Sequence, residues 1–471
     1  MIAKTLHGLE EVLATELTEL GANNIETGRR MVAFTGDKEM LYRANFCLRT
    51  ALRILKPLKH FEAHNPDEVY EQVKAIHWEE YLRPDQTFAV DDTVFSQEFR
   101  HSKFVAYRVK DAVADYFMER EGKRPGVRIS SPDVLLNIHI AETSCTLSLD
   151  SSGASLHRRG YRQEAVEAPL NEVLAAGIIL MTGWRGETDF IDPMCGSGTF
   201  PIEAALIARN IYPGVYRQGY AFENWPDFDA DLLERIYNDD SHERPFEHHI
   251  YGYDNNPQAI GIATRNVKAA GVGRQVSIAL QPFQQFEKPA QPSIIVTNPP
   301  YGERISTNNL LGLYQMIGER LKQQFAGNQA WILSYREECF DQIGLKPTRK
   351  IPLMNGALEC ELRQYEIFAG KYKEFRASGE RLDKEYTDAP DGAPSRDFKP
   401  RRDFKRGDNF RKPGEEREWR PRRDPRNDEQ REYKPRRDFR KGEENFRPKS
   451  DEFRKPRSGE SYPERKRREQ S

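Results

Sequence analysis

The stretch Ile294 to Gly302, with the sequence I-I-V-T-N-P-P-Y-G, constrains the fold of this chain more than any other. Its first residues are apolar or β-branched, which is typical of a short buried strand. Pro299 has a fixed φ and no N–H, and it biases Asn298 toward an extended backbone, so we expect the strand to end there. The Asn298 side chain and the Pro299 carbonyl are then two acceptors at the edge of a sheet.

Such a corner suits the binding of a planar amino group on a nucleobase or an amide. Asn298 and the Pro299 carbonyl could accept the two hydrogens of that group, while Tyr301 could stack on the ring. Pro300 completes the double proline, and Gly302 lets the chain turn away. The alternative is a rigid surface turn, because the same residues are good turn formers. A second motif upstream favours the functional interpretation.

That second motif is Phe190 to Thr199, F-I-D-P-M-C-G-S-G-T, which predicts a strand, a glycine loop and the start of a helix. Pro201 is tolerated in the first turn of that helix. Such a loop brings backbone close to a ligand at the carboxyl end of a parallel strand. It is not a dinucleotide fingerprint, because Pro201 stands where a third glycine is needed. It is not a phosphate-binding P-loop either, because no Gly-Lys-Ser/Thr follows.

A third candidate strand, H-I-Y-G-Y-D, ends at Asp254 and is followed by Asn255. An acid at this place can accept both hydroxyls of a ribose. The alternative is that Asp254 caps the helix that begins near Pro257. The two interpretations do not exclude each other.

Together these strand ends resemble the class I S-adenosylmethionine-dependent methyltransferases, and N-P-P-Y resembles the branch that methylates planar nitrogens (adenine N6, guanine N2 or a protein glutamine amide). The resemblance implies S-adenosylmethionine as the cofactor and no metal. It implies contacts to the target nitrogen from Asn298, Pro299, Pro300 and Tyr301. The cofactor contacts that it implies are Asp192, Pro193, Cys195, Gly196, Gly198, Thr199, Asp254, Asn255, Phe283 and Asn298.

One position departs from the family pattern. Many relatives hold the adenine amino group with an acid after the third strand, where this chain has Pro282. Phe283 could still offer a backbone N–H to the adenine ring, and Gln281 or Gln284 could replace the acid.

Basic residues gather in two segments ahead of these motifs. Arg100, Lys103, Arg108 and Lys110 lie in the first half of F-R-H-S-K-F-V-A-Y-R-V-K-D-A-V-A-D-Y-F, whose second half predicts a helix. Residues 134–141 predict a strand, with T-L-S-L-D as its hairpin partner. Such a unit could seat RNA phosphates, or it could simply begin with a solvated helix. The segment resembles a THUMP domain, an RNA-binding module. Arg158, Arg159 and Arg162, in the basic linker that follows, could also face RNA or could be linker alone.

The order of motifs predicts four parts: an N-terminal ferredoxin-like α/β unit (1–60), a THUMP-like RNA-binding domain (61–154), a class I methyltransferase domain (155–370) and a disordered tail (371–471). In the first unit, residues 9–20 predict an amphipathic helix that Gly21 ends, and Asp37 is placed to cap a second helix through about Leu55. The fold class expected is α/β, with a Rossmann-like, mostly parallel seven-stranded sheet.

Composition supports this organisation. The tail holds 33 Lys and Arg against 24 Asp and Glu, a balance of +9, so the other residues carry −11. Its interspersed aromatic residues suit a tether for single-stranded RNA, although a solvating tail has the same composition. The five cysteines lie far apart and no apolar run of about 18 residues occurs. We therefore expect no zinc site and no membrane span. The absence of paired cysteines also suits a protein of the reducing cytoplasm, which is the location we expect.

Residues 1–370 resemble the bacterial 23S rRNA guanine-N2 methyltransferase family, which is often fused to a second methyltransferase domain. This chain resembles only the first half of that fusion. The resemblance implies methylation of a guanosine N2 in 23S rRNA. We expect the protein to be a monomer. The alternatives are a tRNA guanine-N2 or adenine-N6 methyltransferase, and a non-catalytic RNA-binding factor of ribosome assembly.

Overall fold

The computed structural model of the chain describes residues 1–287, 292–301 and 307–368. Gly302 and the tail predicted at 371–471 lie outside the described residues. Both motif strands and both basic segments lie inside them.

The C-terminal half of the described chain contains a seven-stranded sheet in the order β11-β10-β9-β12-β13-β15-β14. Neighbouring strands run parallel from β11 to β13, and β15 is antiparallel to both β13 and β14. This confirms the predicted mostly parallel seven-stranded sheet, and β15 with β14 forms an antiparallel end. Its strands are β9 (Asp189–Asp192), β10 (Ile250–Asp254), β11 (Val276–Leu280), β12 (Ser293–Thr297), β13 (Asn328–Ser334), β14 (Arg349–Asn355) and β15 (Leu358–Ile367).

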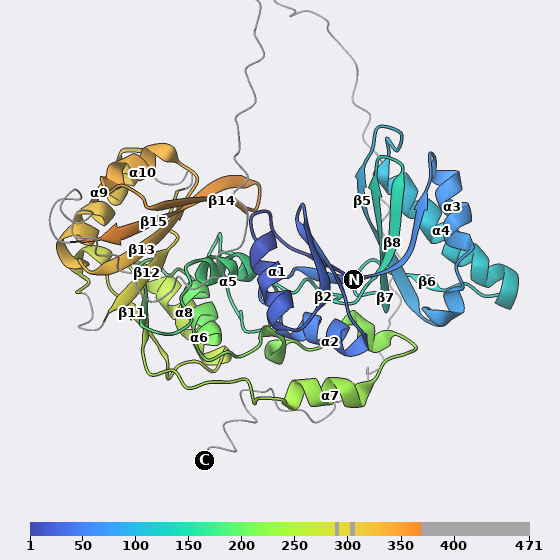
Figure 1. Ribbon diagram of the computed structural model, residues 1–471, viewed down its shortest axis with the longest axis horizontal. Helices are drawn as coiled ribbons and strands as arrows, with labels where there is room; N and C mark the ends of the chain where they lie inside the picture. The colour runs from blue at the N-terminus through green and yellow to red at the C-terminus, as the bar shows by residue number, and fades with distance from the viewer. Residues whose placement is uncertain (288–291, 302–306, 369–471) are drawn as a thin grey trace, which may run out of the picture. The chain divides into compact units, whose positions relative to one another are not determined.

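Alternate residues of the central strands belong to two separate apolar clusters, one on each face of the sheet. In β12, Ile294 and Val296 belong to the cluster that includes α5 and α6, while Ile295 belongs to the cluster that includes α9 and α10. Both faces of the sheet are thus covered by helices (Figure 1). The helices of this half are α5 (Glu172–Met181), α6 (Thr199–Ala208), α7 (Ala230–Asn238), α8 (Pro257–Ala269), α9 (Thr307–Gln324) and α10 (Glu337–Ile343).

The N-terminal part is built on a second sheet of eight strands, in the order β2-β3-β1-β4-β8-β7-β5-β6. Its long strand β4 pairs with β1 through residues 53–55 and with β8 through residues 55–62. The two units predicted at 1–60 and 61–154 therefore share one sheet, and β4 crosses the predicted boundary. The strands are β1 (Ile2–Lys4), β2 (Asn23–Gly28), β3 (Met31–Thr35), β4 (Arg53–Glu62), β5 (Thr87–Phe95), β6 (Gly126–Val127), β7 (Val134–Ala141) and β8 (Ser144–Asp150).

Four helices accompany this sheet: α1 (Glu10–Glu19), α2 (Lys38–Cys47), α3 (Pro66–Lys74) and α4 (Ser102–Glu121). α4 contacts both β5 and α3, so that α3 and α4 lie side by side (Figure 1). The predicted strand at 134–141 is β7, and it forms the predicted hairpin with β8.

The helix predicted from Asp37 to about Leu55 is correct at its start and wrong at its end. Asp37 accepts the N–H of Met40 and caps α2, but α2 ends at Cys47 and β4 begins at Arg53. The reason is a contact from α1: the Glu16 carboxylate accepts the N–H groups of Arg49 and Thr50. These bonds hold Arg49 and Thr50 in a non-helical conformation, so α2 cannot continue through them. No local sequence pattern predicts these bonds.

All five cysteines are buried and free. Within the ranges that the structure describes, no helix has both the length and the apolar character needed to cross a membrane.

Candidate functional site

The glycine loop follows β9, at the carboxyl end of the sheet's central strands. Gly196 and Gly198 have φ of +53° and +82°, a region that L residues rarely adopt. A Cβ on Gly198 would lie 3.2 Å from the Cβ of Ala263 in α8, so the loop also packs closely on that helix. Gly196 is partly exposed, whereas Pro193, Cys195 and Thr199 are buried. The open backbone at Gly196 is the kind of cradle that a ligand can approach closely.

Asp192, the last residue of β9, holds the loop against the neighbouring strand. Its Oδ1 accepts the N–H of Met194 at 3.2 Å and the hydroxyl of Thr297 at 3.0 Å. The side chain is only 2% exposed, and this burial raises the pKa of Asp192 to about 7. The contact to Thr297 places the start of the glycine loop beside the residue that precedes Asn298. A direct contact between Asp192 and the cofactor stays a prediction.

Asp254 ends β10, beside the loop. Its two carboxylate oxygens accept the N–H of Gly196 at 3.0 Å and that of Asn256 at 2.9 Å. The cap of α8 is Asn256, which accepts the N–H of Gln258. The capping role weighed for Asp254 therefore belongs to its neighbour. Asp254 is partly exposed and each oxygen keeps a free lone pair, so it can still accept a hydroxyl. Asn255 is exposed.

Asn298 follows β12 and carries an unused acceptor. Its Oδ1 is buried and has no hydrogen-bond partner among the described residues. A buried acceptor without a partner costs about 1–3 kcal/mol, so such an atom in a native fold calls for an explanation. Pro299 is buried beside it and Pro300 is exposed. The corner thus presents an acceptor that is not used by any residue the structure describes.

Tyr301 faces inward. It is 8% exposed, its ring packs edge-on against Tyr335 with centroids 5.3 Å apart, and its hydroxyl accepts the amide of Asn355 at 2.6 Å. Burial raises the pKa of Tyr301. The expectation that Tyr301 stacks on a target ring is therefore wrong for the ring as it stands here. Stacking would require the ring to leave this position.

The residues at these strand ends fit an adenosyl cofactor. The open backbone of Gly196, the acceptors of Asp254 and the orphan oxygen of Asn298 all lie at the carboxyl ends of β9, β10 and β12. Phe283, after β11, is 3% exposed, so its backbone rather than its ring is the part left for an adenine. The Gln281 side chain donates to the carbonyl of Gln285.

The basic residues predicted to bind RNA divide into two groups. Arg100, Lys103 and Arg158 are exposed, and among the described residues no carboxylate lies within 4 Å of their charged groups. Arg108 instead pairs with Asp67 at 2.8 Å and lies over the Tyr70 ring, which ties α4 to α3. Lys110 pairs with its neighbour Asp111 at 3.3 Å. Only the first three are fully available to a phosphate.

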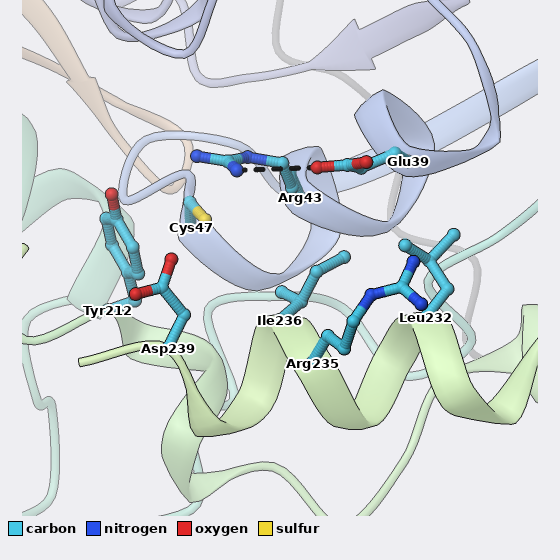
Figure 2. Close-up of a pocket in the computed structure, with 8 residues that line it drawn as sticks. All are labelled: Glu39, Arg43, Cys47, Tyr212, Leu232, Arg235, Ile236 and Asp239. Atoms are coloured by element: carbon cyan, nitrogen blue, oxygen red, sulfur yellow. Dashed lines mark ion pairs between the residues drawn. The ribbon is translucent and has the colours of Figure 1, made fainter. Parts of the chain in front are cut away.

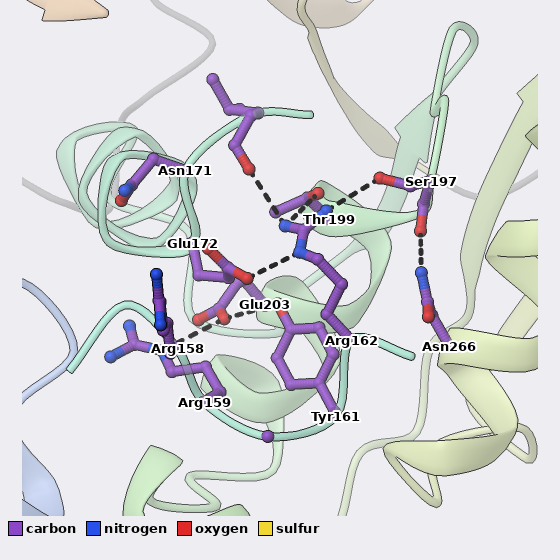
Figure 3. A network of polar contacts seen from close by, with 12 residues as sticks. Arg158, Arg159, Tyr161, Arg162, Asn171, Glu172, Ser197, Thr199, Glu203 and Asn266 are labelled. Carbon is purple, nitrogen blue, oxygen red and sulfur yellow. Dashed lines mark hydrogen bonds and ion pairs between the residues drawn. The ribbon is translucent and has the colours of Figure 1, made fainter. Parts of the chain in front are cut away.

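For Arg159 the RNA-binding prediction is wrong, because the side chain is 1% exposed. Its guanidinium donates to the carbonyls of Leu156 and Arg49 and lies 3.4 Å from Glu203. Glu203 also accepts the Tyr161 hydroxyl at 2.8 Å. The basic linker therefore leaves Arg158 exposed and buries the next residue, Arg159, which lies beside Glu203 (Figure 3).

Three residues support the site from other elements: Arg162 of the basic linker, which the sequence offered only as a residue that could face RNA, and Asn266 and Arg336, which no sequence pattern singled out. Arg162 bonds Ser197 and Thr199 of the glycine loop, and Asn266 bonds the Ser197 carbonyl. Arg336 donates to the Tyr301 carbonyl at 3.2 Å. All three act across the fold, so no local spacing could have revealed them.

A cavity of about 100 Å³ lies between α2 and α7, away from these strand ends (Figure 2). None of the predicted site residues lines it. Glu39 and Arg43 pair across its wall at 3.6 Å. Its lining residues are Glu39, Arg43, Cys47, Tyr212, Leu232, Arg235, Ile236 and Asp239. Across the parts of the chain that are described, no group of three or more His, Cys, Asp and Glu residues could hold a metal ion.

Three family models match the chain in the order of its sheets. Residues 1–55 match the RlmL ferredoxin-like domain, residues 63–150 match the THUMP domain, and residues 159–364 match the RMKL-like methyltransferase domain.

Individual relatives agree with these matches. A Synechocystis protein, slr0064, whose name assigns it only provisionally to the RNA methyltransferases, is 39% identical over 78% of this chain and 96% of its own length. The ribosomal RNA large subunit methyltransferase K/L of Syntrophotalea carbinolica is 40% identical over 76% of this chain. The match covers 52% of that relative, so the chain spans about half of its length.

A solved structure shows the same architecture. The crystal structure of SMU.472, described provisionally as a methyltransferase and complexed with SAH, superposes with a TM-score of 0.70 at 30% identity. The match covers 79% of this chain and 98% of that chain.

Proposed function

This chain belongs to the family of class I, S-adenosylmethionine-dependent RNA methyltransferases that join a THUMP domain to an RlmL-like catalytic domain, and we propose that it methylates the exocyclic N2 of a guanosine in 23S rRNA. The alternatives within enzymes are a tRNA guanine-N2 and an adenine-N6 methyltransferase.

The observation that carries the proposal is the unused, buried Oδ1 of Asn298. An exocyclic amino group has two hydrogens to donate, and the corner holds two acceptors, this oxygen and the Pro299 carbonyl. Thr297 bonds Asp192 and so fixes the strand end beside the glycine loop. The acceptor and the loop that suits the cofactor are therefore held together by the fold.

In this reaction the main task of these residues is to orient the target amino group. A strong acid or base is less important. The cofactor supplies the methyl group. Asn298 and the Pro299 carbonyl would bind both amino hydrogens and draw electron density back onto a nitrogen whose lone pair is delocalised into the ring. The nitrogen gains the methyl group and loses one proton to solvent. Fixed dipoles of this kind lower a barrier without having to reorganise during the reaction.

RNA would be held by the exposed start of α4. Arg100 and Lys103 are free of carboxylate partners among the described residues, and Phe104 and Tyr107 are 50% and 55% exposed on the same helix. Cations with half-exposed aromatic rings suit a strand with unpaired bases, because phosphates are neutralised and bases can stack. The target base must also leave its stack to reach the corner. Residues 371–471 are proposed as a further RNA tether.

The decisive experiment is methylation of transcribed 23S rRNA, followed by mass spectrometry of its nucleosides. The wild-type protein should form N2-methylguanosine. Asn298→Ala should lower the rate at saturating cofactor by about 10²–10³-fold, the scale for removing one oriented group. Its affinity for S-adenosylmethionine, measured by calorimetry, should stay within about twofold. Gln315→Ala, which removes an exposed amide on α9, serves as the matched control and should keep wild-type activity.

Other products would redirect the proposal. N6-methyladenosine would replace guanine N2 by adenine N6, and methylation of tRNA alone would replace the substrate. Cofactor binding without any methylated nucleoside would favour the non-catalytic assembly factor. Loss of cofactor affinity in Asn298→Ala would show that Asn298 serves the cofactor rather than the target nitrogen.

A further inference from the structure

The segment from Gly160 to Val166 joins the two halves of the protein and runs along the glycine loop (Figure 3). A Cβ on Gly196 would lie 3.8 Å from Cγ2 of Val166, so the segment borders the open part of the loop. Its central side chain is Arg162.

Arg162 uses its planar guanidinium to hold three parts of the chain at once. Nε donates to Glu172 at 2.7 Å and Nη1 donates to the Ser197 hydroxyl at 2.9 Å. Nη2 donates to the Leu170 carbonyl and to the Thr199 hydroxyl, both at 3.0 Å. The side chain is 17% exposed, and Ser197 and Thr199 are almost completely buried. A lysine could not make this set of bonds, because its donors radiate from a single atom.

The loop needs such external support. Ser197 stands between two glycines with positive φ, and glycine has the widest choice of backbone conformations. Contacts must therefore select one conformation. Arg162 holds the Ser197 hydroxyl, Asn266 donates to the Ser197 carbonyl at 3.0 Å, and Asp254 accepts the N–H of Gly196.

Asn266 ties the linker to the same point. It is 1% exposed, its Oδ1 accepts the N–H groups of Gln163 and Glu164, and its Nδ2 donates to the Glu164 carbonyl as well as to Ser197. The linker, the loop and α8 are thereby bonded into one unit. Arg162 is the only guanidinium of that unit that reaches the loop's side chains among the described residues.

We propose that Arg162 is a positioning residue, which holds the glycine loop in the conformation that binds S-adenosylmethionine. It acts through Ser197 and Thr199, whose hydroxyls it holds. The inference rests on the cofactor dependence stated under the proposed function. The competing explanation is that Arg162 only contributes to stability, as a buried pair with Glu172.

The test uses the full chain with Arg162→Lys and Ser197→Ala. Ser197→Ala removes one acceptor and leaves the pair with Glu172 intact, so it remains informative if changes at Arg162 impair folding. Arg265→Ala is the matched control, because Arg265 pairs with Glu164 of the same linker at 2.6 Å but at the exposed surface.

Calorimetry should show that Arg162→Lys and Ser197→Ala each weaken S-adenosylmethionine binding, by about tenfold and about threefold, while Arg265→Ala changes it by less than about twofold. KM for the cofactor should rise with Kd, and kcat at saturating cofactor should fall less. The double variant should be weaker than wild type by less than the product of the two single effects, because both act on one contact.

Hydrogen exchange without any cofactor gives an independent readout. Amides of residues 194–199 should exchange faster in Arg162→Lys than in wild type, while those of β7 should not. Unchanged cofactor Kd and unchanged loop exchange in both variants would overturn the inference, even if melting is earlier. Failure of the wild-type protein to bind S-adenosylmethionine would instead overturn the proposed function.

Discussion

The linker and the start of α4 are two basic segments of similar composition, and the fold treats them in opposite ways. In the linker, Arg159 is buried against Glu203 and Arg162 is bonded to the glycine loop. At the start of α4, Arg100 and Lys103 are exposed and have no carboxylate partner within the described ranges. Basic residues of the same kind are thus bonded inside the fold in the linker and exposed at the surface at the start of α4.

The difference follows from what surrounds each segment. The linker passes between the N-terminal sheet and the helices of the catalytic half, where Glu172 and Glu203 are buried and need partners. α4 is covered by β5 and α3 on one side only. Arg108 shows the transition within α4 itself, because one turn further along it already pairs with Asp67 of α3. Nearby acids therefore decide which arginines serve the fold, whether the acids are buried, as Glu172 and Glu203 are, or exposed, as Asp67 is.

The largest effect is expected from Arg159→Ala. The change leaves Glu203 buried, with one oxygen that already lacks a partner among the described residues. Breaking a buried pair on one side costs about 3–5 kcal/mol of the free energy of unfolding. Urea unfolding measures it. The neighbouring Arg158→Ala is the control and should change stability by less than about 0.5 kcal/mol, because Arg158 is exposed. Equal losses in the two variants would remove the distinction between the two arginines.

The next largest effect is expected on the pH dependence of stability, and it comes from the buried carboxyl of Asp192. The pKa of Asp192 is raised by burial to about 7 from an ordinary value of 3.8. The folded state therefore holds this proton more tightly than the unfolded state does. Stability should fall as pH rises through the window from about 4 to 7, by up to about 1.4 kcal/mol per pH unit, and level off above it.

Asp192→Asn keeps an acceptor for Thr297 and cannot ionise, so it should lack this part of the slope. Urea unfolding of both proteins at a series of pH values measures the difference between them. Parallel stability curves across the window would show that Asp192 titrates elsewhere.

The smallest effect is expected on RNA binding, from the exposed basic residues at the start of α4. Replacing Arg100 and Lys103 together by alanine should leave the melting temperature unchanged and weaken the binding of transcribed 23S rRNA. The slope of log affinity against log salt should become shallower by about one for each lost phosphate contact.

Arg108→Ala is the matched control for this surface. It should lower the melting temperature, because it breaks the tie between α4 and α3, and it should leave the salt slope unchanged. If Arg108→Ala alone changed the slope, the division of α4 into a free and an engaged part would be wrong.

The sequence by itself determined the features that depend on neighbouring residues. Asp37 caps α2 and the 134–141 strand forms its hairpin, because caps, turns and alternation act over a few residues. The order of the strand-ending motifs also determined the parallel sheet, since the carboxyl ends of parallel strands meet at one edge. This is how residues as distant as Asp192 and Asn298 could be expected in one site, and the structure links them through Thr297, which precedes Asn298 and bonds Asp192.

Only the tertiary structure decided what depends on contacts between distant segments. Glu16 of α1 ends α2 early, and β4 joins two predicted units into one sheet. Tyr301 turns inward because Tyr335, just after β13, and Asn355 of β14 contact it. The physical reason is common to these cases: a side chain's burial and its hydrogen-bond partners are set by residues far away in sequence, which composition and spacing do not encode.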